Sequence, residues 1–273
     1  MMISTQSPVM VIGGAEDKEN SCDILTTFFK NAGGITANIG IIPCASREPA
    51  LVGDRYYQIF KGMGAEQIQI LDIRYRDECN EMRWLDVLHD CTGIFVTGGD
   101  QLRLCSLLTG TALLQALQAR ISMGKLVLAG TSAGAAMMGE KMIAGGSSGE
   151  SPNRSLVELA EGLGIIPELL VDQHFHNRNR MARLLSAIAA HPDKLGIGID
   201  EDTCVAVGRD GTFQVLGKGT VTVVDCAQLS HTNYGASSET SPLSLHNLKL
   251  HILSQGDRYD YRNRLVLPPL ALG

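Results

Sequence analysis

Residues 126–136 read Leu-Val-Leu-Ala-Gly-Thr-Ser-Ala-Gly-Ala-Ala. This segment predicts a buried strand, a tight Gly-x-Ser-x-Gly turn and a helix that begins near Ala133. A serine on such a turn stands exposed at the carboxyl end of the strand, and Gly130 and Gly134 remove side chains that would clash. The helix N-terminus also favours negative charge that develops nearby. We therefore predict Ser132 as a nucleophile; a serine that only caps the helix is the alternative.

Short apolar runs alternate with helical patterns on both sides of this segment. The runs are continuous, which is typical of strands buried on both faces of a parallel sheet. We expect helices to connect these strands and to cover both faces. The expected strands are Val9–Ile12, Ala37–Ile42, Gln67–Ile73, Gly93–Thr97 and Leu126–Ala129, and the expected helices are Ser21–Ala32, Glu48–Met63, Trp84–His89 and Gln101–Arg120.

The sequence changes character after about residue 195, where the strand patterns are short and linked by turns. This change predicts an antiparallel extension. Its expected strands are Val205–Val207, Thr212–Leu216, Thr220–Val224 and Leu248–Leu253. We therefore predict a single α/β domain over residues 1–273, with three α/β/α layers, a mainly parallel central sheet and a C-terminal antiparallel extension.

Composition excludes some classes of function and indicates the cellular compartment. The chain has 273 residues, of which 44% are hydrophobic, and its net charge is −6. This balance argues against a nucleic-acid binder, which would present a basic face. The seven cysteines are odd in number and form no Cys-x-x-Cys, which indicates reduced thiols rather than a disulfide framework. No apolar run reaches the ~18 residues of a membrane span, and residues 1–8 carry no signal-peptide pattern. We expect a cytoplasmic protein without membrane partners.

A serine nucleophile needs a base whose pKa is near neutrality, which points to histidine. His174 follows the apolar run Leu169–Val171, and the active sites of parallel sheets gather at the carboxyl ends of strands. We therefore predict His174 as the base, with His176 as the alternative. The two share a face at strand spacing, as metal ligands can, but no third ligand lies nearby in the sequence. We predict no metal site.

The acid that orients the base is expected in the run 200–202, Asp-Glu-Asp, which ends another apolar strand. Alternation along a strand separates Glu201 from its two acidic neighbours, and the pattern leaves open which face meets the histidine. A solvated acidic turn remains the alternative for two of the three. The chain order is serine, histidine, acid. This order argues against the α/β-hydrolases, in which the acid precedes the histidine.

An acyl-transfer site also needs donors for the oxyanion. The backbone N–H of Ala133, at the start of the predicted helix, is one candidate. Gly99, in the turn Thr97–Gln101, is the other, because glycine lets the backbone approach a substrate closely. A plain strand-to-helix turn capped by Asp100 is the alternative there.

Five motifs together resemble a known family. They are residues 13–18 (Gly-Gly-Ala-Glu-Asp-Lys), 97–101 (Thr-Gly-Gly-Asp-Gln), 130–135 (Gly-Thr-Ser-Ala-Gly-Ala), 172–175 (Asp-Gln-His-Phe) and 198–203 (Gly-Ile-Asp-Glu-Asp-Thr). In this order they resemble the cyanophycinases, serine exopeptidases of the peptidase E-like group whose core is similar to class I glutamine amidotransferases. The resemblance covers nearly the whole chain. It implies Ser132 as nucleophile, His174 as base and Glu201 as acid, and it implies no metal or organic cofactor.

The resemblance further implies a substrate and an assembly. The substrate would be cyanophycin, a poly-aspartate backbone that bears arginine on each β-carboxyl, and the product the β-Asp-Arg dipeptide. A homodimer is implied as well. Two other hypotheses are a peptidase E-like dipeptidase that cuts after N-terminal aspartate in soluble peptides, and a catalytically silent binding protein on the same fold.

Substrate contacts are expected close to the base in sequence. Forked guanidinium groups suit carboxylates, and substrate guanidinium and peptide groups need acceptors. The candidates are Arg178, Arg180 and Arg183, for which solvated helix arginines are the alternative, and Gln101, Asp172 and Gln173. Residues 145–150 are expected to form a mobile loop over the site, with Glu150 or Arg154 as further contacts; a surface loop without function is the alternative.

Overall fold

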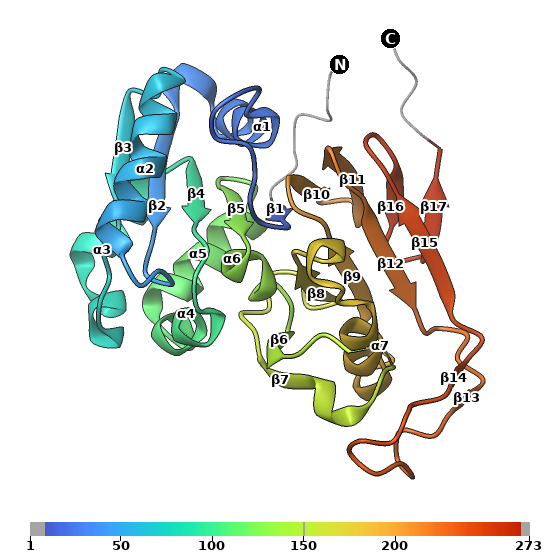
Figure 1. Cartoon of the computed structure of the whole chain (residues 1–273). Helices are drawn as coiled ribbons and strands as arrows, with labels where there is room; N and C mark the ends of the chain where they lie inside the picture. Colours follow the sequence, from blue (N-terminus) through green and yellow to red (C-terminus); the bar gives the residue numbers. More distant parts are fainter. Residues whose placement is uncertain (1–8, 150, 269–273) are drawn as a thin grey trace.

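A large mixed sheet organises the molecule. The computed structural model describes residues 9–149 and 151–268, so the expectations for residues 1–8 and for Glu150 lie outside the described residues. Within these ranges the largest sheet has nine strands in the order β17-β16-β11-β10-β1-β5-β4-β2-β3 (Figure 1). From β1 to β3 all neighbours run parallel. This half comprises β1 (Val9–Ile12), β2 (Asn38–Ile42), β3 (Gln67–Ile70), β4 (Gly93–Val96) and β5 (Val127–Thr131).

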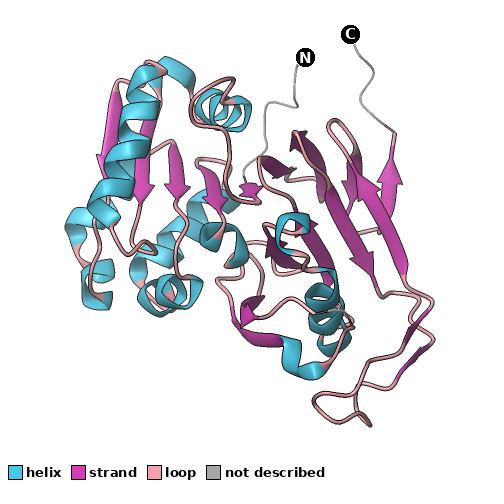
Figure 2. Ribbon diagram, viewed as in Figure 1, coloured by secondary structure: helices cyan, strands magenta, loops and turns pink. Residues whose placement is uncertain are grey.

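Helices cover both faces of the parallel half (Figure 2). The side chains of β1 show why: Val9 and Val11 enter one apolar cluster, whereas Met10 and Ile12 enter another. One cluster includes leucines of α4 and α5, and the other includes Phe28 of α1. The helices are α1 (Asp23–Asn31), α2 (Pro49–Gly62), α3 (Met82–Asp90), α4 (Gln101–Leu108) and α5 (Ala112–Ser122). The predicted three-layer arrangement is confirmed.

One predicted helix is wrong. The segment Gln101–Arg120 forms two helices, because the chain turns at Gly110, whose φ is +72°. Thr111 then caps α5 by accepting a hydrogen bond from the N–H of Leu114. The leucines of both helices enter the same cluster, so their spacing gave no sign of the break.

The antiparallel extension is confirmed, but it divides between two sheets. The central sheet continues through β10 (Thr203–Val207), β11 (Thr212–Gly217), β16 (Arg258–Asp260) and β17 (Leu265–Leu267). A separate sheet has the order β15-β12-β9-β8. It comprises β8 (Leu169–Gln173), β9 (Leu195–Ile199), β12 (Val221–Asp225) and β15 (Lys249–Leu253). The strand that leads to His174 is therefore parallel only to β9, outside the central sheet.

Helix α7 (Met181–Ala190) connects β8 to β9 and packs on this second sheet. Gly196 and Gly198 of β9 allow the approach, since a Cβ at either would press into the side chains of Ile188 or Phe175. Two small hairpins complete the described chain: β6 (Lys141–Gly146) with β7 (Val157–Glu161), and β13 (His231–Thr232) with β14 (Leu245–His246). Among the described residues, none of the helices combines the length and the apolar character needed to cross a membrane.

The two sheets meet where β1 ends. The N–H of His174, after β8, donates to the carbonyl of Gly13 at 2.8 Å, and the N–H of Asp202, after β9, donates to the carbonyl of Gly14 at 2.9 Å. A side chain at Gly13 would overlap the backbone of Ile199 and Asp200. The missing side chain at Gly13 thus lets the carboxyl ends of β1, β8 and β9 come together.

Candidate active site

Ser132 lies on a strained turn between β5 and the single-turn helix α6 (Ala133–Ala136). Its φ is +54° and its ψ is −108°, a conformation that non-glycine residues rarely adopt. Side chains at Gly130 or Gly134 would overlap the carbonyl oxygens of Gly134 and Val96, respectively. The tight packing that both glycines permit therefore keeps the serine at the tip of the turn.

His174 brings an imidazole to this hydroxyl from the second sheet. Its Nε2 lies 3.0 Å from Ser132 Oγ. The residue itself has a φ of +49°, so the backbone is in a rarely occupied region here as well. The ring lies against Gly14, where a Cβ would collide with it. Glycine at this position is therefore a condition for the observed ring placement.

Each carboxylate of the run 200–202 has a different partner. Glu201 Oε1 lies 2.6 Å from His174 Nδ1. Asp200 instead lies 3.1 Å from Nδ1 of His176, and Asp202 lies 2.9 Å from the ammonium of Lys218. Of these three carboxylates, the structure joins Glu201 to the imidazole that faces Ser132.

The surroundings of His174 lower the pKa of its imidazole. Burial is the largest cause, and the positive charges of Arg178 and Arg180 act in the same direction, while the hydrogen bond to Glu201 raises the pKa. The net effect favours a neutral imidazole near pH 7. With its proton on Nδ1, facing Glu201, such a ring presents the Nε2 lone pair to the serine hydroxyl. The line of three side chains can activate a hydroxyl for acyl transfer.

The two predicted oxyanion donors, the backbone N–H groups of Ala133 and Gly99, have no hydrogen-bond acceptor among the described residues. Gly98, the neighbour of Gly99, lies beside the nucleophile: a Cβ there would be 3.2 Å from Ser132 Cβ. Gly99 has a φ of +146°, and its own Cβ would overlap the carbonyl of Ala45. Ala133 therefore adjoins Ser132 in the chain and Gly99 adjoins Gly98, and the oxyanion hole formed by their N–H groups stays a prediction.

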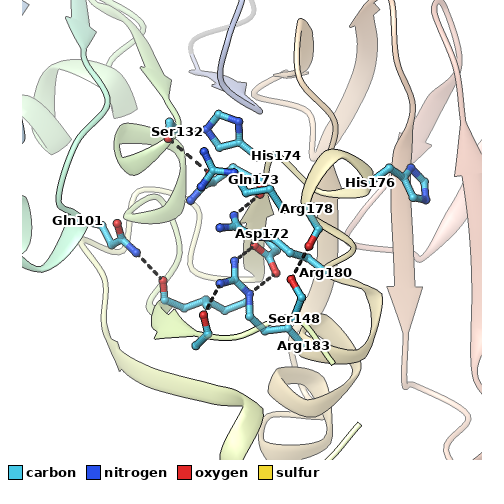
Figure 3. A network of polar contacts seen from close by, with 12 residues as sticks. Gln101, Ser132, Ser148, Asp172, Gln173, His174, His176, Arg178, Arg180 and Arg183 are labelled. Carbon is cyan, nitrogen blue, oxygen red and sulfur yellow. Dashed lines mark hydrogen bonds and ion pairs between the residues drawn. The ribbon is translucent and has the colours of Figure 1, made fainter. Parts of the chain in front are cut away.

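The predicted substrate contacts separate into a buried pair and a more open group. Asp172 is 1% exposed and Arg183 5%; Arg183 donates to both carboxylate oxygens. Arg180 lies 3.4 Å from the same carboxylate and donates to the carbonyl of Gln173. The oxygens of Asp172 are therefore already engaged by arginines of this chain (Figure 3).

Gln101 and Arg178 are more accessible than this pair, whereas Gln173 is buried. Gln173 Oε1 lies 3.4 Å from Ser132 Oγ. Gln101 uses its amide N–H₂ group on the carbonyls of Ile143 and Ala144, so its side-chain oxygen is the atom left for a ligand. Gln101 and Arg178 are therefore the open part of the predicted contact set.

Ser148, in the segment after β6, contacts the site region. Ser148 donates to the carbonyl of Arg178. Arg154, expected to contact a substrate, instead donates to the carbonyl of Ser237 at 3.1 Å and lies over the ring of Tyr234. Its guanidinium group is therefore held away from the serine.

His176, the alternative base, turns away from Ser132 in Figure 3. Besides its contact with Asp200, it lies 3.5 Å from the hydroxyl of Thr220. Within residues 9–149 and 151–268, no three His, Cys, Asp or Glu side chains gather closely enough to hold a metal ion.

Reasoning from the sequence assigned no role to two polar residues that contact this site. Asn177 Oδ1 accepts a hydrogen bond from the N–H of Glu201 at 3.1 Å. Glu16, buried beside the nucleophile turn, accepts one from the hydroxyl of Thr131 at 2.6 Å. The signal for Glu16 was its place in the motif 13–18, after the glycines that follow β1, and nothing in the pattern identified Thr131 as its partner.

Comparison with known proteins identifies a family and a fold. The model of Peptidase family S51 matches residues 9–215. Proteins named cyanophycinase are 60% identical over 265 residues in Trichormus variabilis (97% of this chain, 89% of the relative) and 57% identical over 266 residues in Geminocystis herdmanii (97% of each). Among solved structures, a peptidase from an acI-B1 Actinobacterium superposes with a TM-score of 0.65 at 20% identity, covering 94% of this chain and 100% of that one. A putative peptidase E from Listeria monocytogenes gives 0.52 at 19%, covering 77% and 96%. The solved structures support the fold alone.

Substitution of Gly14 tests the placement of the imidazole. We expect Gly14→Ala to displace the His174 ring and to slow modification of Ser132 by a fluorophosphonate by about 100-fold. Gly64→Ala is the matched control, because Gly64 has the same φ of +96° but a Cβ there would meet nothing closer than Ile35 Cγ2 at 3.7 Å. Equal modification rates in the two variants would contradict the interpretation.

The lowered pKa of His174 predicts the pH dependence of the same reaction. Because only the neutral ring accepts the serine proton, the rate should rise with pH and level off, with a midpoint below the ordinary histidine value of about 6.5. Glu201→Gln removes the carboxylate charge, which raises the pKa of His174 both through the charge-assisted hydrogen bond and through its attraction for the charged ring. The midpoint should therefore move lower still, while the plateau falls by roughly two to four orders of magnitude. Stopped-flow labelling from pH 4.5 to 8.5 would show this; a midpoint that rises in the variant contradicts it.

Proposed function

The chain belongs to peptidase family S51, and from this membership we propose that it is a serine-type exopeptidase that hydrolyses cyanophycin to β-Asp-Arg dipeptides. The observation that carries the proposal is the hydrogen-bonded line from Ser132 through His174 to Glu201, in a chain whose relatives bear the name cyanophycinase. These matches confirm the family resemblance of the five sequence motifs.

In the proposed mechanism Ser132 Oγ attacks the backbone aspartyl carbonyl of the polymer as its proton passes to His174 Nε2. The oxyanion that forms accepts hydrogen bonds from the N–H groups of Gly99 and Ala133. His174 then gives its proton to the departing amine, which leaves an acyl-enzyme. A water molecule, deprotonated by the same ring, hydrolyses the ester and regenerates the serine. Glu201 keeps the Nδ1 proton in place and stabilises the charged ring.

For substrate binding we propose that the predicted contact residues have different roles. Arg178 and Arg180 bind aspartyl carboxylates or the chain terminus, since the forked guanidinium group matches the geometry of a carboxylate. Gln101 and Gln173 offer side-chain oxygens to substrate N–H groups. Asp172 and Arg183 line the base of this region and act chiefly by holding Arg180, because their charges already neutralise each other.

Replacement of the nucleophile tests the activity. Ser132→Ala is expected to abolish release of β-Asp-Arg from purified cyanophycin, as followed by mass spectrometry. Its far-UV circular dichroism and melting temperature should match the unaltered protein, because the β-carbon that packs in the turn is retained. Dipeptide release at an unchanged rate would end the mechanism. If the unaltered protein instead cleaves α-linked aspartyl dipeptides and leaves the polymer intact, the aspartyl-dipeptidase hypothesis holds.

The oligomeric state, the domain organisation and the cellular location are proposed as well. We propose a homodimer from the family resemblance, and light scattering that finds only a monomer would refute it.

We propose one domain over residues 1–273, since each sheet supplies part of the site; a single cooperative unfolding transition is the expected result. A cytoplasmic location fits the seven free cysteines, six of them buried, and cell fractionation checks it.

A further inference from the structure

A buried carboxylate lies directly behind the nucleophile turn. Glu16, in the loop between β1 and α1, has a side chain that is 1% exposed. Its oxygens accept hydrogen bonds from the hydroxyls of Tyr56 and Thr131 and lie 2.9 Å from the ammonium of Lys18. An ionised carboxylate only accepts hydrogen bonds, and here its oxygens contact donors of Tyr56, Thr131 and Lys18. These contacts together hold the Glu16 side chain in one position.

The same stretch of chain, residues 12–17, contacts the backbone of Ser132 and of His174 and the residue that follows Glu201. The carbonyl of Ile12 accepts a hydrogen bond from the N–H of Ser132 at 3.0 Å, and that of Gly13 accepts one from the N–H of His174. At Asp202, the residue after Glu201, the N–H of Asp17 donates to the side-chain carboxylate at 2.8 Å. Residues 12–17 thus set the relative positions of segments that come from two sheets.

Glu16 is anchored on its other side to the rigid core. The ring of Tyr56 packs against Phe95, with centroids 4.5 Å apart, and lies in the aromatic group that includes Phe60. Burial and the nearby carboxylate raise the pKa of the Tyr56 hydroxyl well above its usual value, so this hydroxyl remains a donor. The acceptor that Thr131 uses is therefore held firmly in place.

Thr131 passes this constraint to the nucleophile, because it is the residue just before Ser132. The serine has a strained φ of +54°, and strain of this kind persists only where the surroundings over-determine the backbone. The N–H of Ser132 is held on one side and the hydroxyl of Thr131 on the other. Without the second contact, the turn gains freedom to relax and to move Oγ away from the imidazole.

We propose that Glu16 is a positioning residue for Ser132, acting through the hydroxyl of Thr131. The inference rests on the proposed function, because it concerns the rate of the acylation step. Glu16 touches neither the substrate nor the reacting atoms. Its loss should therefore lower kcat while leaving KM nearly unchanged, since the substrate contacts lie elsewhere.

A matched pair at Thr131 tests the proposal. Thr131→Val keeps the shape of the side chain and removes the donor, whereas Thr131→Ser keeps the donor and loses a methyl group. We expect kcat for dipeptide release to fall about 10- to 100-fold in the valine variant and to stay close to the unaltered value in the serine variant, with KM within a factor of two in both. Concentrations of active sites are counted by fluorophosphonate titration, so partial unfolding does not imitate a lower kcat.

The outcomes separate positioning from simple stability. A valine variant that melts earlier but keeps its kcat per active site overturns the proposal, as does a serine variant that loses as much kcat as the valine variant. If the valine variant does not fold, Thr131→Ala removes the same donor without risk of overpacking, and the same loss of kcat is required.

Failure of the proposed function would look different. In that case the unaltered protein would release no dipeptide from cyanophycin. The rate of fluorophosphonate labelling of Ser132 still compares the three proteins, because that reaction needs no polymer. A labelling rate that falls with valine and is kept with serine supports the positioning role whatever the substrate; equal rates overturn it.

Discussion

The close contact between the end of β1 and the segments that follow β8 and β9 is the constraint on which the site depends. One sheet carries the nucleophile, and the other carries the imidazole and its carboxylate partner. They meet only because Gly13 and Gly14 present bare backbone, so that the carbonyl of Gly13 can accept the N–H of His174 and the ring can lie against Gly14. A β-carbon at either position would hold the sheets apart, and the hydroxyl would lose its base.

Much of the fold could be predicted from the sequence, because buried strands and helices place their apolar residues at characteristic spacings. Continuous apolar runs such as Val9–Ile12 identified the parallel strands, and helical spacing identified the covering layers. Strand pairing leaves no such pattern in the sequence. The sequence therefore did not reveal that Leu169–Gln173 lies beside β9 in the second sheet, outside the central one. The break at Gly110 was hidden for a related reason, since the helices on both sides of it bury their leucines in one cluster.

The parts of the site that depend on neighbouring residues could be predicted from the sequence, whereas the parts that depend on residues far apart in the chain could not. The Ser132 turn is specified by five adjacent residues and is therefore visible in the sequence. The partner of the imidazole was not visible from strand alternation, because residues 200–202 form a turn in which Asp202 has a φ of +49°. Glu16 escaped notice because Tyr56 and Thr131 are 40 and 115 positions away in the chain. Convergence of that kind is a property of the folded state.

The paired charges of Asp172 and Arg183 bear on how such a pocket could diversify. Loss of Asp172 alone leaves the buried Arg183 without its carboxylate partner, at a cost of roughly 3–5 kcal/mol. A lineage that changes Asp172 must therefore pass through a poorly folding ancestor or replace the arginine as well, which makes this part of the site slow to evolve. Arg178, exposed at the surface, carries no such penalty. Under the proposed function, new substrate preferences would arise first at this arginine.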